Sequence, residues 1–219
     1  MKYFYQIISA LVLVGVCSAT QAGPISNLED VTNGGGFFAD VSFVNNGVDT
    51  VTITADIGSP INAGLTQGDI LGLWFDLADF SALSGSASIS ANSASTTPVI
   101  SFSENAVSYS LGGNVNINGS GENNWDLGLV VGENGKSGGF NQFISFDLKI
   151  AGLLESQFQD QRVGMRVQSI KGATNFSSGS SKLIGPGGTV VIPEPSLFVI
   201  LGLGLFGLGL TRRITAKRV

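Results

Sequence analysis

Histidine is absent from this chain of 219 residues, and cysteine occurs only once, as Cys17. Without histidine, the chain cannot build a Ser-His or Cys-His nucleophilic pair, and no zinc site can use imidazole ligands. With a single cysteine, it cannot form an internal disulfide. These absences exclude most nucleophilic catalytic systems and leave carboxylates as the main groups available for chemistry.

Basic side chains are also scarce. No Lys or Arg occurs between residues 23 and 135, where twelve Asp and Glu residues lie, and residues 23–192 carry nine more acidic than basic side chains. Nucleic acids and anionic membrane surfaces bind positive charge, so neither is expected as a partner. The acidic half has two interpretations: solvating charges on an exported protein, or oxygen ligands for Ca²⁺. No other cofactor is predicted, and no set of metal ligands is assigned.

The N-terminal residues have the parts of a secretory signal peptide. Lys2 provides a positive charge, residues 7–16 are largely apolar, and small residues precede a cleavage site after Ala22. The apolar stretch is too short for a membrane-spanning helix. Cleavage after Ala19 competes with cleavage after Ala22. Because no twin arginine is present, we expect the general secretion machinery and signal peptidase as partners.

Cys17 has a second interpretation, as the acylated residue of a lipoprotein. That processing usually needs a small residue directly before the cysteine, and Val16 is not small. We therefore expect Cys17 to leave with the signal peptide, so that the exported protein has no thiol chemistry.

The C-terminal residues combine a kinked acidic motif, an apolar run and a basic end. The apolar run of fourteen residues would span roughly 21 Å as a helix, against a hydrocarbon core of about 30 Å. A single transmembrane helix of this length is marginal, and the basic end favours the cytoplasm. The parts are Pro193, Glu194 and Pro195, then residues 197–210, then Arg212 and Arg213 as the membrane stop.

This tail resembles the PEP-CTERM sorting signal of bacterial exosortase substrates. The resemblance implies that a membrane exosortase recognises the Pro-Glu-Pro motif and removes the apolar segment. It also implies a Gram-negative source that makes extracellular polysaccharide. The protein would then be exported, anchored transiently in the inner membrane, and delivered to the cell surface or beyond it. A simple single-span anchor with a coincidental motif is the alternative.

The region between the two ends alternates apolar and small polar residues in short runs. Examples are residues 39–43, 51–54, 107–111 and 143–148, and turn-forming Gly, Asn and Ser clusters separate about ten such runs. This pattern predicts an all-β domain, a single β-sandwich or jelly roll, with one helical turn within residues 153–161. The predicted organisation is a signal peptide at residues 1–22, an extracytoplasmic β domain at 23–192 and a sorting signal at 193–219.

Ligand contacts are predicted where a polar loop meets an aromatic residue. Trp125 follows such a loop and is expected to be exposed, whereas Trp74 lies in an apolar run and is expected in the core. Glu122 and Asp126 flank Trp125 and complete the candidate ligand site. Arg166 alternates with apolar neighbours, so we expect it on the outer face, paired with an acidic neighbour.

The body is expected to be non-enzymatic, a surface or extracellular-matrix protein. The carboxylate pairs Asp76 with Asp79 and Glu122 with Asp126 leave a glycosidase as the least favoured alternative. A lectin-like module that binds extracellular polysaccharide, with or without Ca²⁺, is the second hypothesis.

Overall fold

The computed structural model describes residues 25–32, 35–58, 60–90, 99–112, 115–117, 123–131, 139–177 and 179–186. All described elements lie in one compact unit, Gly23–Val191. The predicted signal peptide, the apolar segment 197–210 and the basic end lie outside the described residues. Within the described ranges, no helix has the length and apolar character needed to cross a membrane.

Ten strands and two short 3₁₀ helices make up the described part of the chain. They are β1 (Ile25–Asp30), β2 (Phe38–Asn45), β3 (Thr50–Asp56), β4 (Gln67–Phe75), η1 (Phe80–Ala82), β5 (Ser84–Ser90), β6 (Val99–Val107), β7 (Trp125–Val131), β8 (Phe143–Ala151), η2 (Glu155–Phe158), β9 (Arg162–Lys171) and β10 (Gly179–Pro186). The predicted all-β class is confirmed, and the helical turn predicted within residues 153–161 is η2.

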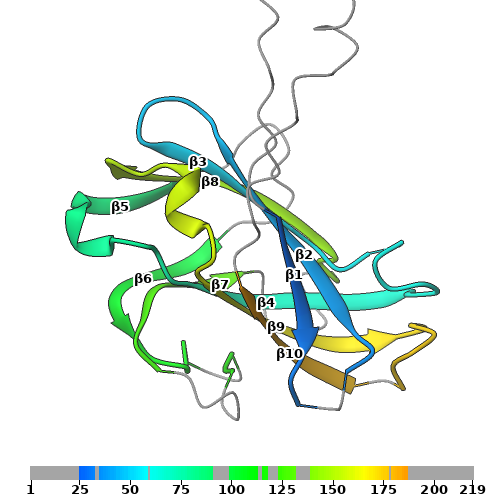
Figure 1. The fold of residues 1–219 in the computed structure, drawn as a ribbon. Helices are drawn as coiled ribbons and strands as arrows, with labels where there is room; N and C mark the ends of the chain where they lie inside the picture. The colour runs from blue at the N-terminus through cyan, green and yellow to red at the C-terminus, as the bar shows by residue number, and fades with distance from the viewer. Residues whose placement is uncertain are drawn as a thin grey trace, which may run out of the picture. The chain divides into compact units, whose positions relative to one another are not determined.

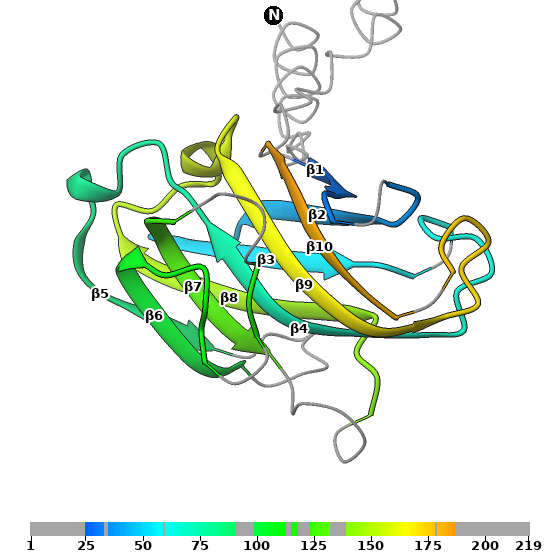
Figure 2. The ribbon, with the colours of Figure 1, turned by 90° about the horizontal axis from the view of Figure 1, so that it is seen from below.

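The ten strands form one sheet in the order β5-β8-β3-β2-β1-β10-β9-β4-β7-β6, and every pairing is antiparallel (Figure 1). The sheet rolls over on itself and is nearly closed. β5 and β6 are its two edges, although they follow one another in the sequence. In both ribbon views these edge strands lie on the same side of the sheet (Figure 2).

The main hydrophobic core fills the inside of the rolled sheet. In β2 and β3 buried and half-exposed residues alternate, which places Val41, Phe43 and Ile53 inside. Phe158 of η2 stacks on Phe43 with ring centroids 4.2 Å apart, and Phe75 of β4 meets both rings edge-on. Strands with one buried face explain the period of two in the sequence.

A second hydrophobic cluster covers the outer face of β4, β7 and β9. A β-bulge between Ile70 and Gly72 breaks the alternation of β4, and every residue of this strand after Gln67 is buried. Trp74 belongs to the outer cluster and is completely buried. Its register partners are Gly128 on β7 and Gly164 on β9. A Cβ at Gly128 would collide with Val107 and Leu111, and a Cβ at Gly164 would lie tightly against Ile117 and Trp125.

The segment that follows β6 closes over this outer face. Val107, Val115 and Ile117 are buried in the outer cluster, and the indole nitrogen of Trp74 donates to the carbonyl of Ser108 at 3.0 Å. The prediction of a strand at residues 107–111 is therefore wrong. Residue 107 ends β6, and beyond it the described ladder is a single bridge between Ser110 and Asn116. The apolar residues there cover the outside of the sheet.

Candidate functional site

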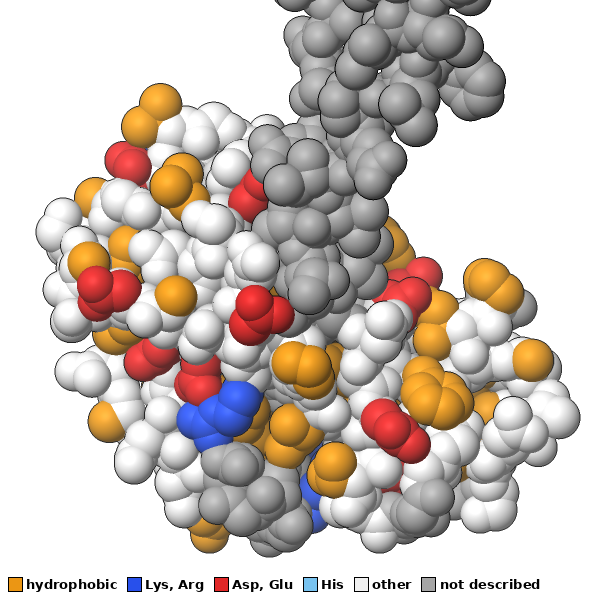
Figure 3. Space-filling view, viewed as in Figure 1, with side chains coloured by type: hydrophobic (Ala, Val, Ile, Leu, Met, Phe, Trp, Pro, Cys, Tyr) orange, Lys and Arg blue, Asp and Glu red, His pale blue; other side chains and the backbone are white. Residues whose placement is uncertain are grey.

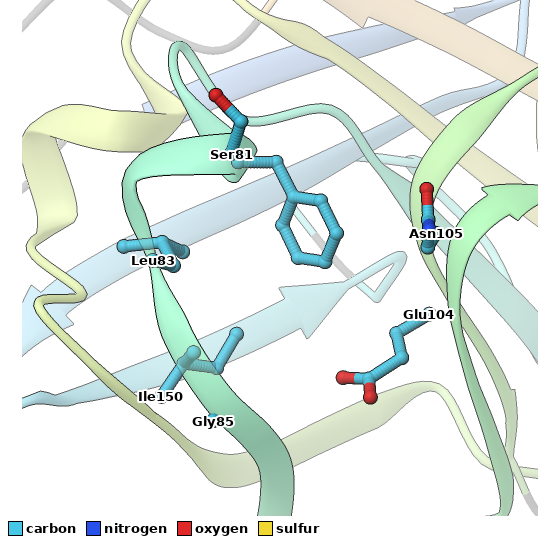
Figure 4. A pocket seen from close by; sticks show the side chains of 7 residues that line it. Ser81, Leu83, Gly85, Glu104, Asn105 and Ile150 are labelled. Carbon is cyan, nitrogen blue, oxygen red and sulfur yellow. The ribbon is translucent and has the colours of Figure 1, made fainter.

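The open seam between β5 and β6 holds a pocket of about 350 Å³. Apolar side chains and polar groups share its walls. The lining residues are Phe80, Ser81, Leu83, Gly85, Glu104, Asn105 and Ile150. They come from both edges of the sheet, from η1 and from the end of β8, so the pocket exists because the sheet does not close (Figure 4).

Glu104 reaches across the seam from β6. One carboxylate oxygen, Oε2, accepts a hydrogen bond from the backbone N–H of Ala87 on β5 at 3.1 Å. In Figure 4 the carboxylate extends from its strand into the space facing Gly85. The Glu104 side chain thus accepts the hydrogen bond of a backbone N–H on the edge strand β5, a bond that a neighbouring strand would otherwise accept.

The backbone of both edges is irregular beside the pocket. Asn105 and Ala106 have φ values of 65° and 50°, and the β6–β7 register shifts between Glu104 and Val107. On the other edge Gly85 has φ 81°, and the β5–β8 register also shifts. Two consecutive left-handed residues without a glycine store strain of about 1–3 kcal/mol each. Irregularities of this kind are common at the edges of sheets.

Two of the predicted carboxylates, Asp76 and Asp126, lie at a different part of the sheet, around Arg162. Arg162 forms an ion pair with Asp76, and its guanidinium lies 4.5 Å from the ring centroid of Trp125. Asp126 accepts a hydrogen bond from the backbone N–H of Leu77 at 2.8 Å. The carboxylates of Asp76 and Asp126 are close enough to interact electrostatically. Each carboxylate therefore has a structural partner.

The pKa of Asp126 is raised above its ordinary value of 3.8. Burial is the main cause, and the charge of Asp76 adds to it, whereas the Leu77 N–H and the charge of Arg162 act in the opposite direction. Because the folded state then holds this proton more tightly than the unfolded state, stability falls as the pH rises from 3.8 through the raised pKa.

We expect Asp126→Asn to remove this fall in stability with rising pH. The amide oxygen can still accept from Leu77, so the variant should gain slightly on the wild type above the raised pKa. Asp76→Asn breaks the ion pair with Arg162 and should lose about 1–3 kcal/mol. Denaturant unfolding at a series of pH values measures both. A stability loss for Asp126→Asn that matches that of Asp76→Asn would contradict the assignment.

The other predicted site residues have separate positions. Asp79 caps η1, where its Oδ1 accepts from the Ala82 N–H at 3.1 Å and from the Ser81 hydroxyl at 2.8 Å. Glu122 lies outside the described residues. Trp125 was expected to be exposed, and that expectation is wrong because its side chain is 0% exposed. Trp74 is equally buried, as predicted. The structure thus brings the half-exposed Asp126 and the buried Trp125 beside Arg162, which is itself half-exposed.

Arg166 lies on the outer face of β9, as the alternation predicted, but its expected acidic partner is wrong. Its register neighbours are Lys182 on β10 and Gly72 on β4, and within the described part of the chain it forms no ion pair. Burial lowers the pKa of Arg166. Burial and the charge of Arg166 lower the pKa of Lys182 as well.

The acidic side chains do not gather into a metal site in the described ranges, where no three carboxylate or thiol residues lie together. On the face in Figure 3 the acidic groups are scattered among uncharged ones. Asp40 and Asp56 are register partners on β2 and β3. Burial, and then the charge of Asp56, raises the pKa of Asp40.

Comparisons with known proteins found no matching family model, curated protein or solved structure. The seam pocket was not predicted from the sequence. One signal does mark it, because Glu104 is the only charged residue between positions 80 and 121.

Proposed function

We propose that this protein is an exported, non-enzymatic surface or extracellular-matrix protein, sorted and processed at its C-terminus by an exosortase. Its rolled sheet would be a body of the sandwich or jelly-roll kind. The observation that carries the proposal is the tripartite tail, which begins at Pro193 shortly after β10 ends at Pro186. The predicted signal peptide, β domain and sorting tail follow one another along the chain in the order that export, folding and tail removal require.

The non-enzymatic part of the proposal draws on the carboxylates. A glycosidase needs two carboxylic groups that face a shared substrate. Here Asp76 binds Arg162, Asp126 accepts from the backbone, and Asp79 caps a 3₁₀ turn. Each of these contacts gives its carboxylate a role in holding the fold, which supports a structural or binding protein over a hydrolase.

The tail itself supplies the mechanism of processing. Pro193 and Pro195 lack an amide donor and resist helix formation, so the motif would stay extended next to the membrane. Glu194 is costly to bury and would hold the motif at the outer surface, while Arg212 and Arg213 would hold the other end in the cytoplasm. A membrane protease would then meet the motif at a fixed depth.

Replacing Pro193, Glu194 and Pro195 with alanine should abolish processing in a host with an active exosortase. The variant should accumulate uncut in the inner membrane, whereas mass spectrometry of the surface or secreted wild type should show a C-terminus near Glu194. Pro186→Ala, which changes a proline outside the motif, serves as the matched control. A mature wild-type protein that retains residues 197–219 would replace sorting with simple anchoring.

A lectin-like module for extracellular polysaccharide is the second candidate function. The seam pocket favours it, because the pocket combines apolar walls with hydrogen-bonding groups, and small-molecule sites are typically built this way. The two candidates are compatible, since a matrix protein that binds polysaccharide would be both.

A further inference from the structure

We propose that the seam between β5 and β6 binds an uncharged sugar unit, with Glu104 and Asn105 as its hydrogen-bonding groups and Phe80 as its apolar platform. This inference rests on the second candidate function and assigns the site and the class of sugar. It involves none of the residues around Trp125 that the sequence first indicated.

The size and position of the pocket suit such a ligand. A volume of about 350 Å³ lies at the small end of the range for specific ligand sites, about 300–1,000 Å³. One or two sugar rings would fill it. Because the pocket is open along the seam, a longer polysaccharide could continue along the edge strands while one unit occupies the pocket.

Two adjacent residues of β6, Glu104 and Asn105, supply hydrogen-bonding groups to the lining of the pocket. Glu104 uses Oε2 to accept from Ala87, and Oε1 has no hydrogen bond within the described part of the chain. A carboxylate oxygen accepts strong hydrogen bonds from hydroxyl groups. Asn105 adds an amide that both donates and accepts. Sugar hydroxyls need acceptors and donors side by side, and adjacent residues of β6 supply them.

The apolar wall matches the other surface of a sugar ring. Phe80, Leu83 and Ile150 line the pocket, and Phe80 is only partly buried in the core. The C–H groups of a sugar form an apolar face that packs on aromatic and aliphatic side chains. Ligand pockets generally combine such walls with a few placed polar groups.

Charge decides the class of sugar. No Lys or Arg lines the pocket, and Glu104 is its only ionisable side chain. A uronate or sulfated sugar would bring a negative charge next to this carboxylate in a protein that is acidic overall. The site therefore selects uncharged units over acidic ones.

The strained backbone prepares the site before binding. Asn105 and Ala106 hold left-handed conformations that ordinary strand pairing would remove. They coincide with the register shift between β6 and β7, directly beside the two residues of β6 that line the pocket. Strained residues of this kind cluster at binding sites, where the surrounding fold maintains them.

The test measures binding of the full-length protein in a zwitterionic detergent without a sugar headgroup. The uncharged probes are cellotetraose, chitotetraose and a tetramer of galactose, and the acidic probe is a guluronate tetramer. Calorimetry and saturation-transfer NMR should detect binding of an uncharged probe and none of the acidic one. Glu104→Gln should weaken that binding about tenfold or more, because Gln keeps an acceptor for Ala87 but offers the sugar a donor in place of Oε1.

Two further variants define the site. Phe80→Leu keeps an apolar side chain but removes the ring, and we expect about a threefold to tenfold loss of affinity. Asp160→Asn removes one surface carboxylate that does not line the pocket, at a left-handed position that Asn tolerates, so its affinity should equal that of the wild type. Melting temperatures of all three variants verify that each is folded.

Three outcomes would overturn the inference. If no uncharged probe binds at millimolar concentration, both the pocket assignment and the lectin-like function fail. If binding is unchanged in Glu104→Gln and Phe80→Leu, the pocket assignment fails while the binding function stands. If the guluronate probe binds best, the sugar class is wrong. None of these results bears on export and sorting, which the tail variant tests separately.

Discussion

Phe158→Ala should lower the free energy of unfolding by about 3–5 kcal/mol, the usual loss when a buried phenylalanine is truncated. Phe158 is 0% exposed and lies in η2, the short turn between β8 and β9. Its ring stacks on Phe43 at 4.2 Å and meets Phe75 edge-on at 5.9 Å. Alanine would remove the ring that links β2, through Phe43, to β4, through Phe75. It would leave a cavity that these two strands cannot collapse to fill.

Denaturant unfolding of the full-length protein, followed by tryptophan fluorescence, measures this loss. Trp74 and Trp125 are both buried, so unfolding exposes both reporters to water. Phe140→Ala is the matched control, because its side chain is 45% exposed and truncation should change stability by less than about 0.5 kcal/mol. Equal losses in the two variants would show that the stacked rings do not hold the core together.

Gly172→Ala should destabilise the protein by about 3–5 kcal/mol through two effects that act at one position. Gly172 has φ +84°, a conformation that disfavours any residue with a side chain. A Cβ there would also lie 2.5 Å from the carbonyl oxygen of Gly64. The two loops are joined nearby, where the N–H of Thr174 donates to the carbonyl of Ala63 at 2.8 Å. The loops would have to separate to admit the methyl group.

Gly47→Ala separates the two effects. Gly47 also has a left-handed φ, +111°, but a Cβ there would have no atom within 4 Å. The Gly47→Ala variant should lose only the stability that the unfavourable φ costs, about 1–2 kcal/mol. The same unfolding assay compares the two variants. If Gly172→Ala is no worse than Gly47→Ala, the loops are not in the tight contact that the structure shows.

The strands that sequence alone located are those with one buried face. Val41, Phe43 and Ile53 alternate with Ser and Thr, because water covers one side of β2 and β3. β4 was recognised as apolar for a different reason, since clusters on both of its faces bury it. A local sequence pattern reflects which side chains are buried. It therefore identifies a strand wherever buried and exposed side chains alternate with the two-residue period of a β-strand.

The failures have the same origin. Residues 107–111 alternate like a strand, yet Val107 and Leu111 pack on the outside of the sheet. Their side chains occupy the space that a Cβ at Gly128 would need. Trp125 follows a polar loop, but the outer cluster and the guanidinium of Arg162 enclose its ring. The seam pocket joins residues 80–85 to residues 104–105 and 150. Contacts between distant segments depend on the closure of the sheet, which no local pattern encodes.

The pairing of β1 with β10 sets the order in which this protein can fold. Glu29 faces Ile184 and Asp30 faces Leu183, so the first strand finds one of its neighbours at the far end of the domain. At about 5–20 residues per second, synthesis of the intervening chain takes roughly eight to thirty seconds. Throughout that time β1 has only β2 as a pairing partner. A chain built this way cannot complete its sheet until its last strand has been made.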